Sequence, residues 1–296
     1  GHEVHGMARS ARSLELVRQR GAEPVATDLS TINPETLEGF EAVIHCAARA
    51  EDWGSRDAFR QANVEGTRSI LKAARAAKIR RFVFVGTEAA FFTGQDLIDL
   101  DENAPYPDRQ RYLYSESKAE AERLALSQTD LEVISIRPRF VWGPRDTSVL
   151  PALLRMQEAG SFAWIDHGRV RTSTTHVFNV VHALELALTK GRPGEAYFVA
   201  DDGTRTVREF LSAMVRAGAG VELSSRNLPS WVARPLARIV ETIWGLILPD
   251  KAPPMTRFAI DMLSSTVTVN DAKARAELGY SPVISVEDGL AQLRQL

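Results

Sequence analysis

Short apolar runs alternate with longer amphipathic stretches through most of this chain. A short apolar run bounded by turn residues is typical of a buried strand, and apolar positions three or four apart are typical of a helix. Their alternation is typical of β-α-β units, in which helices cover a parallel sheet. The expected strands are residues 2–7, 24–26, 42–46, 81–85, 132–136 and 196–199, and the clearest helices between them are residues 64–78 and 115–127. The pattern therefore predicts an α/β fold.

After Pro138 the alternation weakens, and helical patterns dominate in residues 207–217, 231–248 and 286–296. A smaller, mostly helical cap is therefore expected beside the parallel sheet. The strand at 196–199 returns to the sheet, so the two units interleave along the chain. We expect a cofactor-type α/β domain in residues 1–140 and 173–200, and a substrate-binding cap in residues 141–172 and 201–296.

Composition excludes several classes of protein. The 36 Lys and Arg against 38 Asp and Glu give a net charge of −2, so no basic surface for nucleic acid is expected. No apolar run reaches the ~20 residues of a membrane span. The single cysteine, Cys46, cannot form an internal disulfide, which favours a reducing compartment, and we expect a cytoplasmic protein. The six histidines lack metal-ligand spacing and no G-x-S-x-G motif occurs, so neither a metal site nor a hydrolase is expected.

The most informative motif is Tyr-Ser-Glu-Ser-Lys, which spans Tyr114 to Lys118. Residues four apart share one face of a helix. An ammonium group beside a phenol favours the phenolate, so Lys118 is expected to lower the pKa of Tyr114 from about 10. Such a phenol can act as a general acid or base near neutral pH. Taken alone, the pair fits an exposed helix surface equally well.

Two neighbouring strands give this pair a chemical setting. The strand at 81–85 delivers Thr87 at its carboxyl end, and the strand at 132–136 leads into the Pro-Gly-rich turn that follows Pro138. Ligands bind at the carboxyl ends of strands in open parallel sheets. We therefore expect Thr87, Tyr114 and Lys118 to converge where a substrate carbonyl could sit.

The order of these motifs resembles the extended short-chain dehydrogenase/reductase family, within the NAD-dependent epimerase/dehydratase superfamily. Further matches are residues 42–48, the Asn-Val-Glu-Gly-Thr motif at 63–67 and the Asp-Leu pair at 28–29. The resemblance implies a Rossmann-type doubly wound parallel sheet, with Thr87, Tyr114 and Lys118 as catalytic residues beside a nicotinamide cofactor. The cofactor-binding residues it implies are Arg9, Asp28, Leu29, Ala47, Ala48, Asn63, Tyr114, Lys118, Pro138 and Val141. It also implies a homodimer.

One part of the family pattern is absent. The Gly-x-x-Gly-x-x-Gly loop after the first strand does not occur, and residues 1–9 match the second strand of the family. In this fold the first strand is central, so its absence leaves a gap between strands two and four. We expect that roughly 20–25 residues of a β-α unit precede this sequence, the alternative being a natural chain without that strand.

In this family, the residue at the end of the second strand determines whether NAD or NADP is preferred. A carboxylate there binds the ribose of NAD, whereas Arg suits the phosphate of NADP. This chain has Arg9 there, with Arg12 close by and no carboxylate. NADP(H) is therefore expected in preference to NAD(H), and the alternative is that Arg9 is an ordinary surface residue.

Two fragments, residues 48–55 and 253–258, resemble the 3β-hydroxysteroid dehydrogenase-like branch, which implies a ketone or secondary alcohol on a bulky hydrophobic substrate. Thr87 is followed by Glu88 and Ala89, so the second carboxylate of the dehydratases is missing. The apolar stretch at 228–248 is a candidate for a substrate entrance, a peripheral membrane contact or plain cap packing. Trp53, Trp142 and Trp164 would suit a hydrophobic pocket, although plain core or cap packing is the more frequent role of tryptophan.

The sequence therefore predicts an NAD(P)-dependent oxidoreductase that interconverts a ketone and a secondary alcohol. Two alternatives stay open. One is a nucleotide-sugar epimerase with tightly bound NAD, and the other is a non-catalytic dinucleotide-binding protein.

Overall fold

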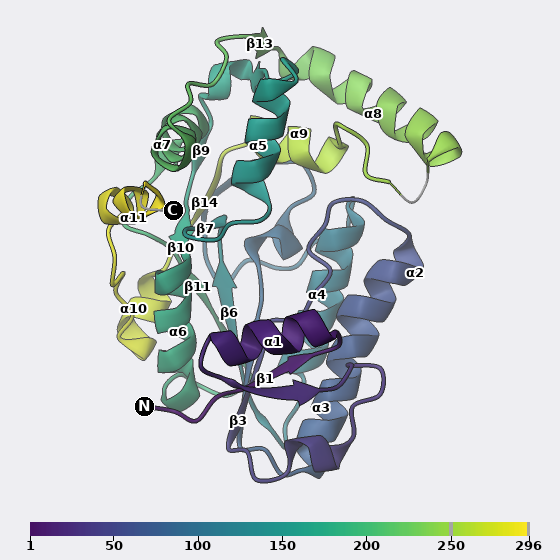
Figure 1. Ribbon diagram of the computed structural model, residues 1–296, viewed down its shortest axis with the longest axis vertical. Helices are drawn as coiled ribbons and strands as arrows, with labels where there is room; N and C mark the ends of the chain where they lie inside the picture. The colour runs from purple at the N-terminus through teal and green to yellow at the C-terminus, as the bar shows by residue number, and fades with distance from the viewer. Residues whose placement is uncertain (249–250, 295–296) are drawn as a thin grey trace.

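A four-stranded parallel sheet lies at the centre of the computed structural model, which describes residues 1–248 and 251–294 (Figure 1). Its strands, in spatial order, are β11 (Glu195–Val199), β6 (Glu132–Pro138), β4 (Arg81–Val85) and β3 (Ala42–His45). Strands β4 and β6 are buried on both faces, which is why β4 carries the apolar run Phe82–Val85 rather than an alternating pattern. The return of the strand near Ala196 to this sheet is confirmed, since β11 pairs in parallel with β6.

Helices cover both faces of this sheet. Alternate side chains of β4 point to opposite sides, so Phe82 and Phe84 pack with α3 (Gly66–Ala76) and α4 (Leu113–Leu126). On the other face, Val83 and Ile134 pack with α6 (Val177–Thr189) and α10 (Ala272–Leu278). This is the two-sided covering of a doubly wound α/β fold.

The N-terminal segment forms a separate small sheet. Strand β1 (His5–Ala8) pairs in parallel with β2 (Glu23–Ala26) across helix α1 (Ala11–Gln19), which Ser10 caps. Among the described residues β1 makes no ladder with β3, and Ile44 of β3 stays 41% exposed. The gap expected between these two strands is therefore present in the structure.

The second half of the molecule has its own core, which includes Trp142, Trp164 and Phe210. Its helices are α5 (Val149–Glu158), α7 (Val207–Ala219), α8 (Ser230–Ile247), α9 (Arg257–Ser264) and α11 (Val286–Leu293). A mixed sheet joins β12 (Arg205–Thr206), β9 (Arg171–Thr172), β14 (Val267–Val269) and β5 (Leu97–Leu100). Two further pairs are β7 (Val141–Trp142) with β10 (Thr175–His176), and β8 (Trp164–Ile165) with β13 (Asn227–Leu228). These short strands were not predicted, because none has an apolar run long enough to detect.

Some predicted boundaries were wrong. The helix expected over 64–78 is a π-helical turn, η2 (Arg60–Glu65), followed by α3. The Thr67 hydroxyl donates to the carbonyl oxygen of Asn63 at 2.6 Å, and this bond competes with the regular helical ladder. The first strand begins at His5 rather than at residue 2. Helix α11 ends at Leu293, and residues 295–296 of the expected C-terminal helix lie outside the described residues.

The remaining elements are one short α-helix and three 3₁₀ turns. They are α2 (Arg56–Phe59), η1 (Pro34–Leu37), η3 (Glu88–Phe91) and η4 (Asp166–Gly168). Within the described ranges, no helix has the length and apolar character that a bilayer crossing requires.

Candidate active site

The candidate site begins where β4 ends. Thr87 follows Val85 and Gly86, is 9% exposed, and caps η3 by accepting a hydrogen bond from the Ala89 amide at 3.2 Å. A Cβ atom at Gly86 would lie 2.5 Å from Oε1 of Glu122 and 2.7 Å from Oγ of Ser135. Only glycine therefore lets the chain pass this point and present Thr87 at the sheet edge.

Tyr114 lies in the first turn of α4, which packs against η3. Its side chain shares a hydrogen bond with the Thr87 side chain, and its ring meets the Phe258 ring of α9 edge-on at 6.0 Å. The structure therefore brings Thr87 and Tyr114 together, and it adds an aromatic neighbour from the cap that sequence reasoning did not single out.

Lys118 lies one turn further along α4 and is 6% exposed. Its Nζ atom donates to the Val85 carbonyl at 2.6 Å and lies 4.4 Å from the centre of the Phe84 ring. Burial lowers the pKa of Lys118 to about 8, against the opposing effects of Glu122 and Cys46. Among the described residues this ammonium group has one hydrogen-bond acceptor for three donors, so it has room for oxygen atoms of a ligand.

The expected lowering of the Tyr114 pKa is wrong for this structure. Burial, together with the negative charge of Glu88, raises the pKa of Tyr114 to about 12, while the hydrogen bond with Thr87 lowers it in part. The physical reason is that loss of solvent around the phenol outweighs any effect of Lys118, whose ammonium group is directed to the Val85 carbonyl. The phenol is therefore held in its protonated form.

A buried ion pair adjoins Thr87. Oε2 of Glu88 accepts a hydrogen bond from the Thr87 hydroxyl at 2.9 Å, and Oε1 of Glu88 lies 3.0 Å from Nη1 of Arg139. Sequence reasoning treated Glu88 only as part of an incomplete dehydratase motif and missed Arg139. The sequence did contain a signal for this pair, because Glu88 and Arg139 follow two strands that are adjacent and parallel in the predicted sheet.

Asn63 links the loop after β3 to α4. Its Oδ1 accepts from the Arg49 amide at 2.6 Å, and its Nδ2 donates to Oγ of Ser117 at 2.8 Å. Ala47 and Ala48 belong to the same loop, which has no regular secondary structure. The interactions of Asn63 therefore fix this loop beside the helix that carries Tyr114 and Lys118.

The remaining predicted cofactor residues lie at other strand ends. Arg9, whose side chain is 81% exposed, follows β1, and its Nη1 lies 3.3 Å from Oδ2 of Asp28, which follows β2. Hydrogen bonds from Ser30 lower the pKa of Asp28, so the carboxylate stays charged. Leu29 packs close to Gly66. Pro138 ends β6, and the exposed Val141 begins β7.

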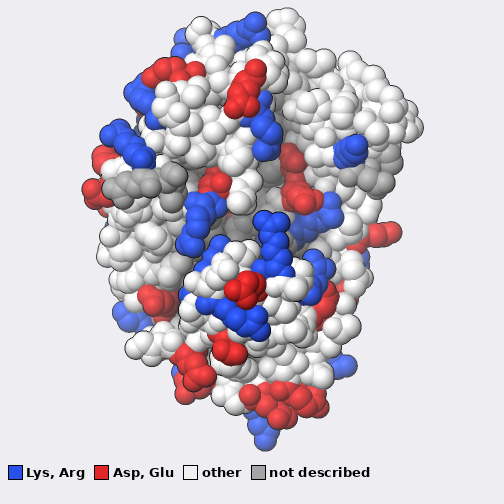
Figure 2. Space-filling model, viewed as in Figure 1, with Lys and Arg blue, Asp and Glu red and all other residues white. Residues whose placement is uncertain are grey.

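These strand ends border a hollow in the surface. Figure 2 shows it between the half that carries α1 and the half that carries α5 and α8, with Lys and Arg side chains along its edge. Figure 2 shows acidic side chains beside the hollow as well, but the Lys and Arg side chains at its edge and an under-coordinated Lys118 suit an anionic dinucleotide with ribose hydroxyls. The residues present therefore fit such a cofactor, although the sequence holds no Gly-rich phosphate loop.

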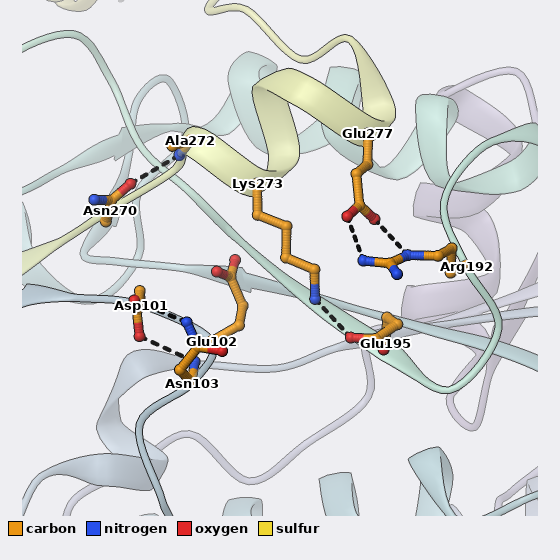
Figure 3. A pocket seen from close by; sticks show the side chains of 9 residues that line it. All are labelled: Asp101, Glu102, Asn103, Arg192, Glu195, Asn270, Ala272, Lys273 and Glu277. Atoms are coloured by element: carbon orange, nitrogen blue, oxygen red, sulfur yellow. Dashed lines mark hydrogen bonds and ion pairs between the residues drawn. The ribbon is translucent and has the colours of Figure 1, made fainter.

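A different hollow, of about 470 Å³, contains none of these residues (Figure 3). In it Lys273 pairs with Glu195 at 2.6 Å, and Arg192 pairs with Glu277. Both of its cations are paired with carboxylates, so we regard it as a surface ion-pair cluster. Within the described ranges, no group of three or more His, Cys, Asp or Glu side chains is placed to hold a metal ion.

Two of the three tryptophans expected to suit a substrate pocket lie elsewhere. Trp142 and Trp164 are fully buried in the core of the second half, so their assignment to the pocket was wrong. His176 caps α6 by accepting from the Phe178 amide at 3.3 Å, in keeping with a structural role.

Comparison with known proteins agrees with this geometry. The family described as 3-beta hydroxysteroid dehydrogenase/isomerase matches residues 14–230. The 4-hydroxy-2-methyl-3-oxo-4-farnesyl-3,4-dihydroquinoline-1-oxide ketoreductase of Stigmatella aurantiaca is 37% identical over 301 residues, covering 100% of this chain and 89% of that protein. The 2-alkyl-3-oxoalkanoate reductase of Shewanella oneidensis is 31% identical over 313 residues, covering 99% and 80%.

Solved structures show the same fold. The crystal structure of gox2253 superposes with a TM-score of 0.76 and 27% identity, covering 100% of this chain and 91% of that one. The UDP-glucuronic acid 4-epimerase of Bacillus cereus, in complex with NAD, gives a TM-score of 0.73 at 17% identity, covering 99% and 90%.

The helix-covered parallel sheet is a Rossmann-type fold, and the family and the named relatives define the class as an oxidoreductase. The chain belongs to the 3-beta hydroxysteroid dehydrogenase/isomerase family, within the extended short-chain dehydrogenases/reductases.

Proposed function

We propose that this protein is an NADP(H)-preferring ketoreductase that converts a ketone on a bulky hydrophobic molecule to a secondary alcohol. The observation that carries the proposal is the contact of Thr87 with Tyr114 at the end of β4, one helical turn from the buried Lys118. We propose further that residues 1–140 and 173–200 bind the cofactor, and that residues 141–172 and 201–296 form the substrate-binding cap.

A bound nicotinamide dinucleotide supplies the hydride that reaches the carbonyl carbon. Lys118 would hold the ribose hydroxyls next to the nicotinamide, and Pro138 and Val141 would flank the ring. At the other end, the exposed guanidinium of Arg9 would bind the phosphate that distinguishes NADP from NAD. Asp28 and Leu29 would contact the adenosine, while Ala47, Ala48 and Asn63 would line the path between the two ends.

Tyr114 would act as the proton donor. Its raised pKa keeps the phenol protonated at neutral pH, so its O–H is available for the oxygen atom of the substrate carbonyl. As the carbon accepts hydride, the C=O double bond becomes a C–O single bond, and the oxygen takes the proton of Tyr114. Thr87 would keep the phenol oxygen in position through the contact of the two side chains.

Two observations support a hydrophobic substrate. Phe258 of the cap lies against the Tyr114 ring, and a Cβ atom placed on Gly245 of α8 would lie 3.7 Å from the indole of Trp53, which belongs to the loop after β3. The cap therefore places apolar groups next to the reacting position. The names of the relatives agree, since they describe a ketoreductase of a farnesyl compound and a 2-alkyl-3-oxoalkanoate reductase.

The proposal is tested by following nicotinamide absorbance with NADPH and with NADH. The substrates are 2-alkyl-3-keto acids, 3-ketosteroids and nucleotide sugars, each tested separately. We expect NADPH consumption with at least one hydrophobic ketone and none with a nucleotide sugar. Protein that purifies with bound NAD, ignores every ketone and epimerises a nucleotide sugar would contradict the proposal.

We also propose that helix α8 rests on a lipid surface from which the substrate enters. Its outer face is apolar, with Trp231 77% exposed and Leu246 82% exposed, and Ile239, Ile243 and Ile247 lie between and beside them. Exposed Arg238 borders this face, an arrangement that suits anionic lipid headgroups. Sedimentation with anionic vesicles should therefore retain the protein, and Ile243→Ser with Leu246→Ser should release it. Equal retention of both proteins would contradict this contact.

A homodimer through the helices near Tyr114 is proposed on family grounds. The outer side of α4 meets η2 through the ion pair Arg60–Glu120 at 2.7 Å, with both side chains partly exposed. Analytical ultracentrifugation tests the dimer, and a monomer at micromolar concentration would contradict it.

A further inference from the structure

The carboxylate of Glu88 has one partner on each oxygen. Oε2 accepts a hydrogen bond from the Thr87 hydroxyl at 2.9 Å, and Oε1 pairs with Nη1 of Arg139 at 3.0 Å. Glu88, Arg139 and Thr87 are 3%, 6% and 9% exposed, so water screens these interactions little. The pair connects the carboxyl end of β4 with that of β6.

Arg139 is fixed by its backbone as well as by Glu88. Its amide donates to Oγ1 of Thr175 at 3.1 Å, and its carbonyl accepts from the same hydroxyl at 2.9 Å. Nε of Arg139 has no hydrogen-bond partner among the described residues. Removing two charges from water is costly, and an apolar pair of similar volume often stabilises a fold as well. Stability alone is therefore a weak reason for this ion pair beside the active site.

The position of the Thr87 hydroxyl proton gives a better reason for the Glu88–Arg139 ion pair. A threonine hydroxyl has a single hydrogen, so Thr87 cannot donate to Glu88 and to the Tyr114 oxygen at the same time. We propose that Glu88, anchored by Arg139, is a positioning residue that competes with Tyr114 for the Thr87 proton. The inference rests on the ketoreductase function proposed above.

Two effects of Glu88 then act in the same direction. Its negative charge disfavours the Tyr114 phenolate, and its hydrogen bond with Thr87 competes with the one by which Thr87 lowers the pKa of Tyr114. The groups around the phenol are Thr87 and Glu88 from the β4 end, Lys118 from α4 and Phe258 from α9. Because Lys118 is directed to the Val85 carbonyl, Glu88 is the charged residue that acts on the Tyr114 pKa. The arrangement keeps Tyr114 ready to give its proton to a ketone.

The test compares the wild type with Glu88→Gln and Glu88→Asp. Ketone reduction should slow at high pH, because Tyr114 then loses the proton that it donates. We call this decrease the alkaline limb of the kcat profile. In Glu88→Gln the limb should move about one pH unit lower. Glu88→Asp retains the charge and should keep the limb near the wild-type position. An unmoved limb in Glu88→Gln would overturn the inference.

A double-mutant cycle tests the path through Thr87. If Glu88 acts partly through this hydroxyl, Glu88→Gln should change kcat/KM at least threefold less in a Thr87→Val background than in the wild type. Equal factors in the two backgrounds would contradict the coupling. Glu88→Gln leaves the buried Arg139 charge unpaired, so the double variant Glu88→Gln with Arg139→Met is measured too, and it should show the same shift of the limb.

A matched control removes another buried carboxylate. Asp201 accepts from the Trp142 indole at 2.8 Å and from the His176 amide at 2.7 Å, and it is not among the groups that act on the Tyr114 pKa. Asp201→Asn should lower the melting temperature and leave the alkaline limb unmoved. If the alkaline limb of kcat shifts by the same amount in this control, the shift in Glu88→Gln reflects a general destabilisation of the fold rather than the role of Glu88.

The inference can fail separately from the proposed function. If the wild type reduces a ketone and the alkaline limb does not move in Glu88→Gln, the ketoreductase function is supported and the proposed role of Glu88 is contradicted. If no ketone is reduced, ultraviolet difference titration against Tyr114→Phe still measures tyrosinate formation directly. Glu88→Gln should then form more Tyr114 tyrosinate at pH about 11 than the wild type does, and equal signals would overturn the inference.

Discussion

The Nζ atom of Lys118 lies 2.6 Å from the carbonyl oxygen of Val85. This bond joins the helix that carries Tyr114 to the strand that delivers Thr87, so the three residues share one rigid support. It also explains why the ammonium group leaves the Tyr114 pKa unlowered, since its direct contact is with the strand end. The geometry orients Lys118 toward the region where we expect the cofactor ribose.

The buried ammonium group of Lys118 should make stability depend on pH. Its pKa is about 8 in the folded state and about 10.4 when unfolded, so the unfolded chain binds more protons between these values. The free energy of unfolding should therefore rise with pH in this window, by about 1.6 kcal/mol from pH 8 to 9.5. Urea unfolding at the two pH values measures this rise, and Lys118→Met should remove it. An equal rise in the variant would assign the effect to another group.

Gly86→Ala should destabilise the fold and disturb the site. The added Cβ would meet Glu122 and Ser135 at 2.5 and 2.7 Å, inside a buried network that also holds Arg137. We expect a loss of about 1–3 kcal/mol in the free energy of unfolding, as for other overpacked cores. Gly245→Ala is the control, because its nearest neighbour lies at 3.7 Å and alanine favours a helix. Similar losses in both variants would contradict the packing argument.

Arg9→Ala should change the cofactor preference. The exposed guanidinium is the cation that follows β1 at the position expected to meet the 2′-phosphate. Its loss should raise KM for NADPH about tenfold and leave KM for NADH nearly unchanged, since only NADPH carries that phosphate. Steady-state kinetics with both cofactors measure the difference. Arg20→Ala serves as a surface control, and equal changes for both cofactors would contradict the assignment.

Much of the fold could be predicted from the sequence because buried parallel strands leave a simple signal. The strand Arg81–Val85 was located to the residue, since it is apolar and flanked by clear turns. The short strands of the cap gave no such signal, and the π-helical turn at Arg60–Glu65 depends on a side-chain hydrogen bond that periodicity does not reveal.

The site was only partly predictable. The joining of Thr87 with Tyr114 followed from the order of strand ends. The direction of the pKa change did not follow, because spacing along a helix reveals neither burial nor the side to which a long Lys side chain turns. The Glu88–Arg139 pair needs the register of β4 beside β6, which is a property of the folded sheet.

The central claim is that Tyr114 donates the proton during ketone reduction, and Tyr114→Phe tests it most directly. NADPH consumption with a hydrophobic ketone and NADPH binding by fluorescence are measured on the same preparations, with Tyr280→Phe as the control for loss of a buried phenol. Tyr280 donates to the Ala200 carbonyl at 2.9 Å, away from Thr87 and Lys118. The account predicts that Tyr114→Phe lowers kcat at least 10²-fold with NADPH affinity near the wild-type value, whereas Tyr280→Phe retains turnover. Retained turnover in Tyr114→Phe, or equal losses in both variants, would contradict it.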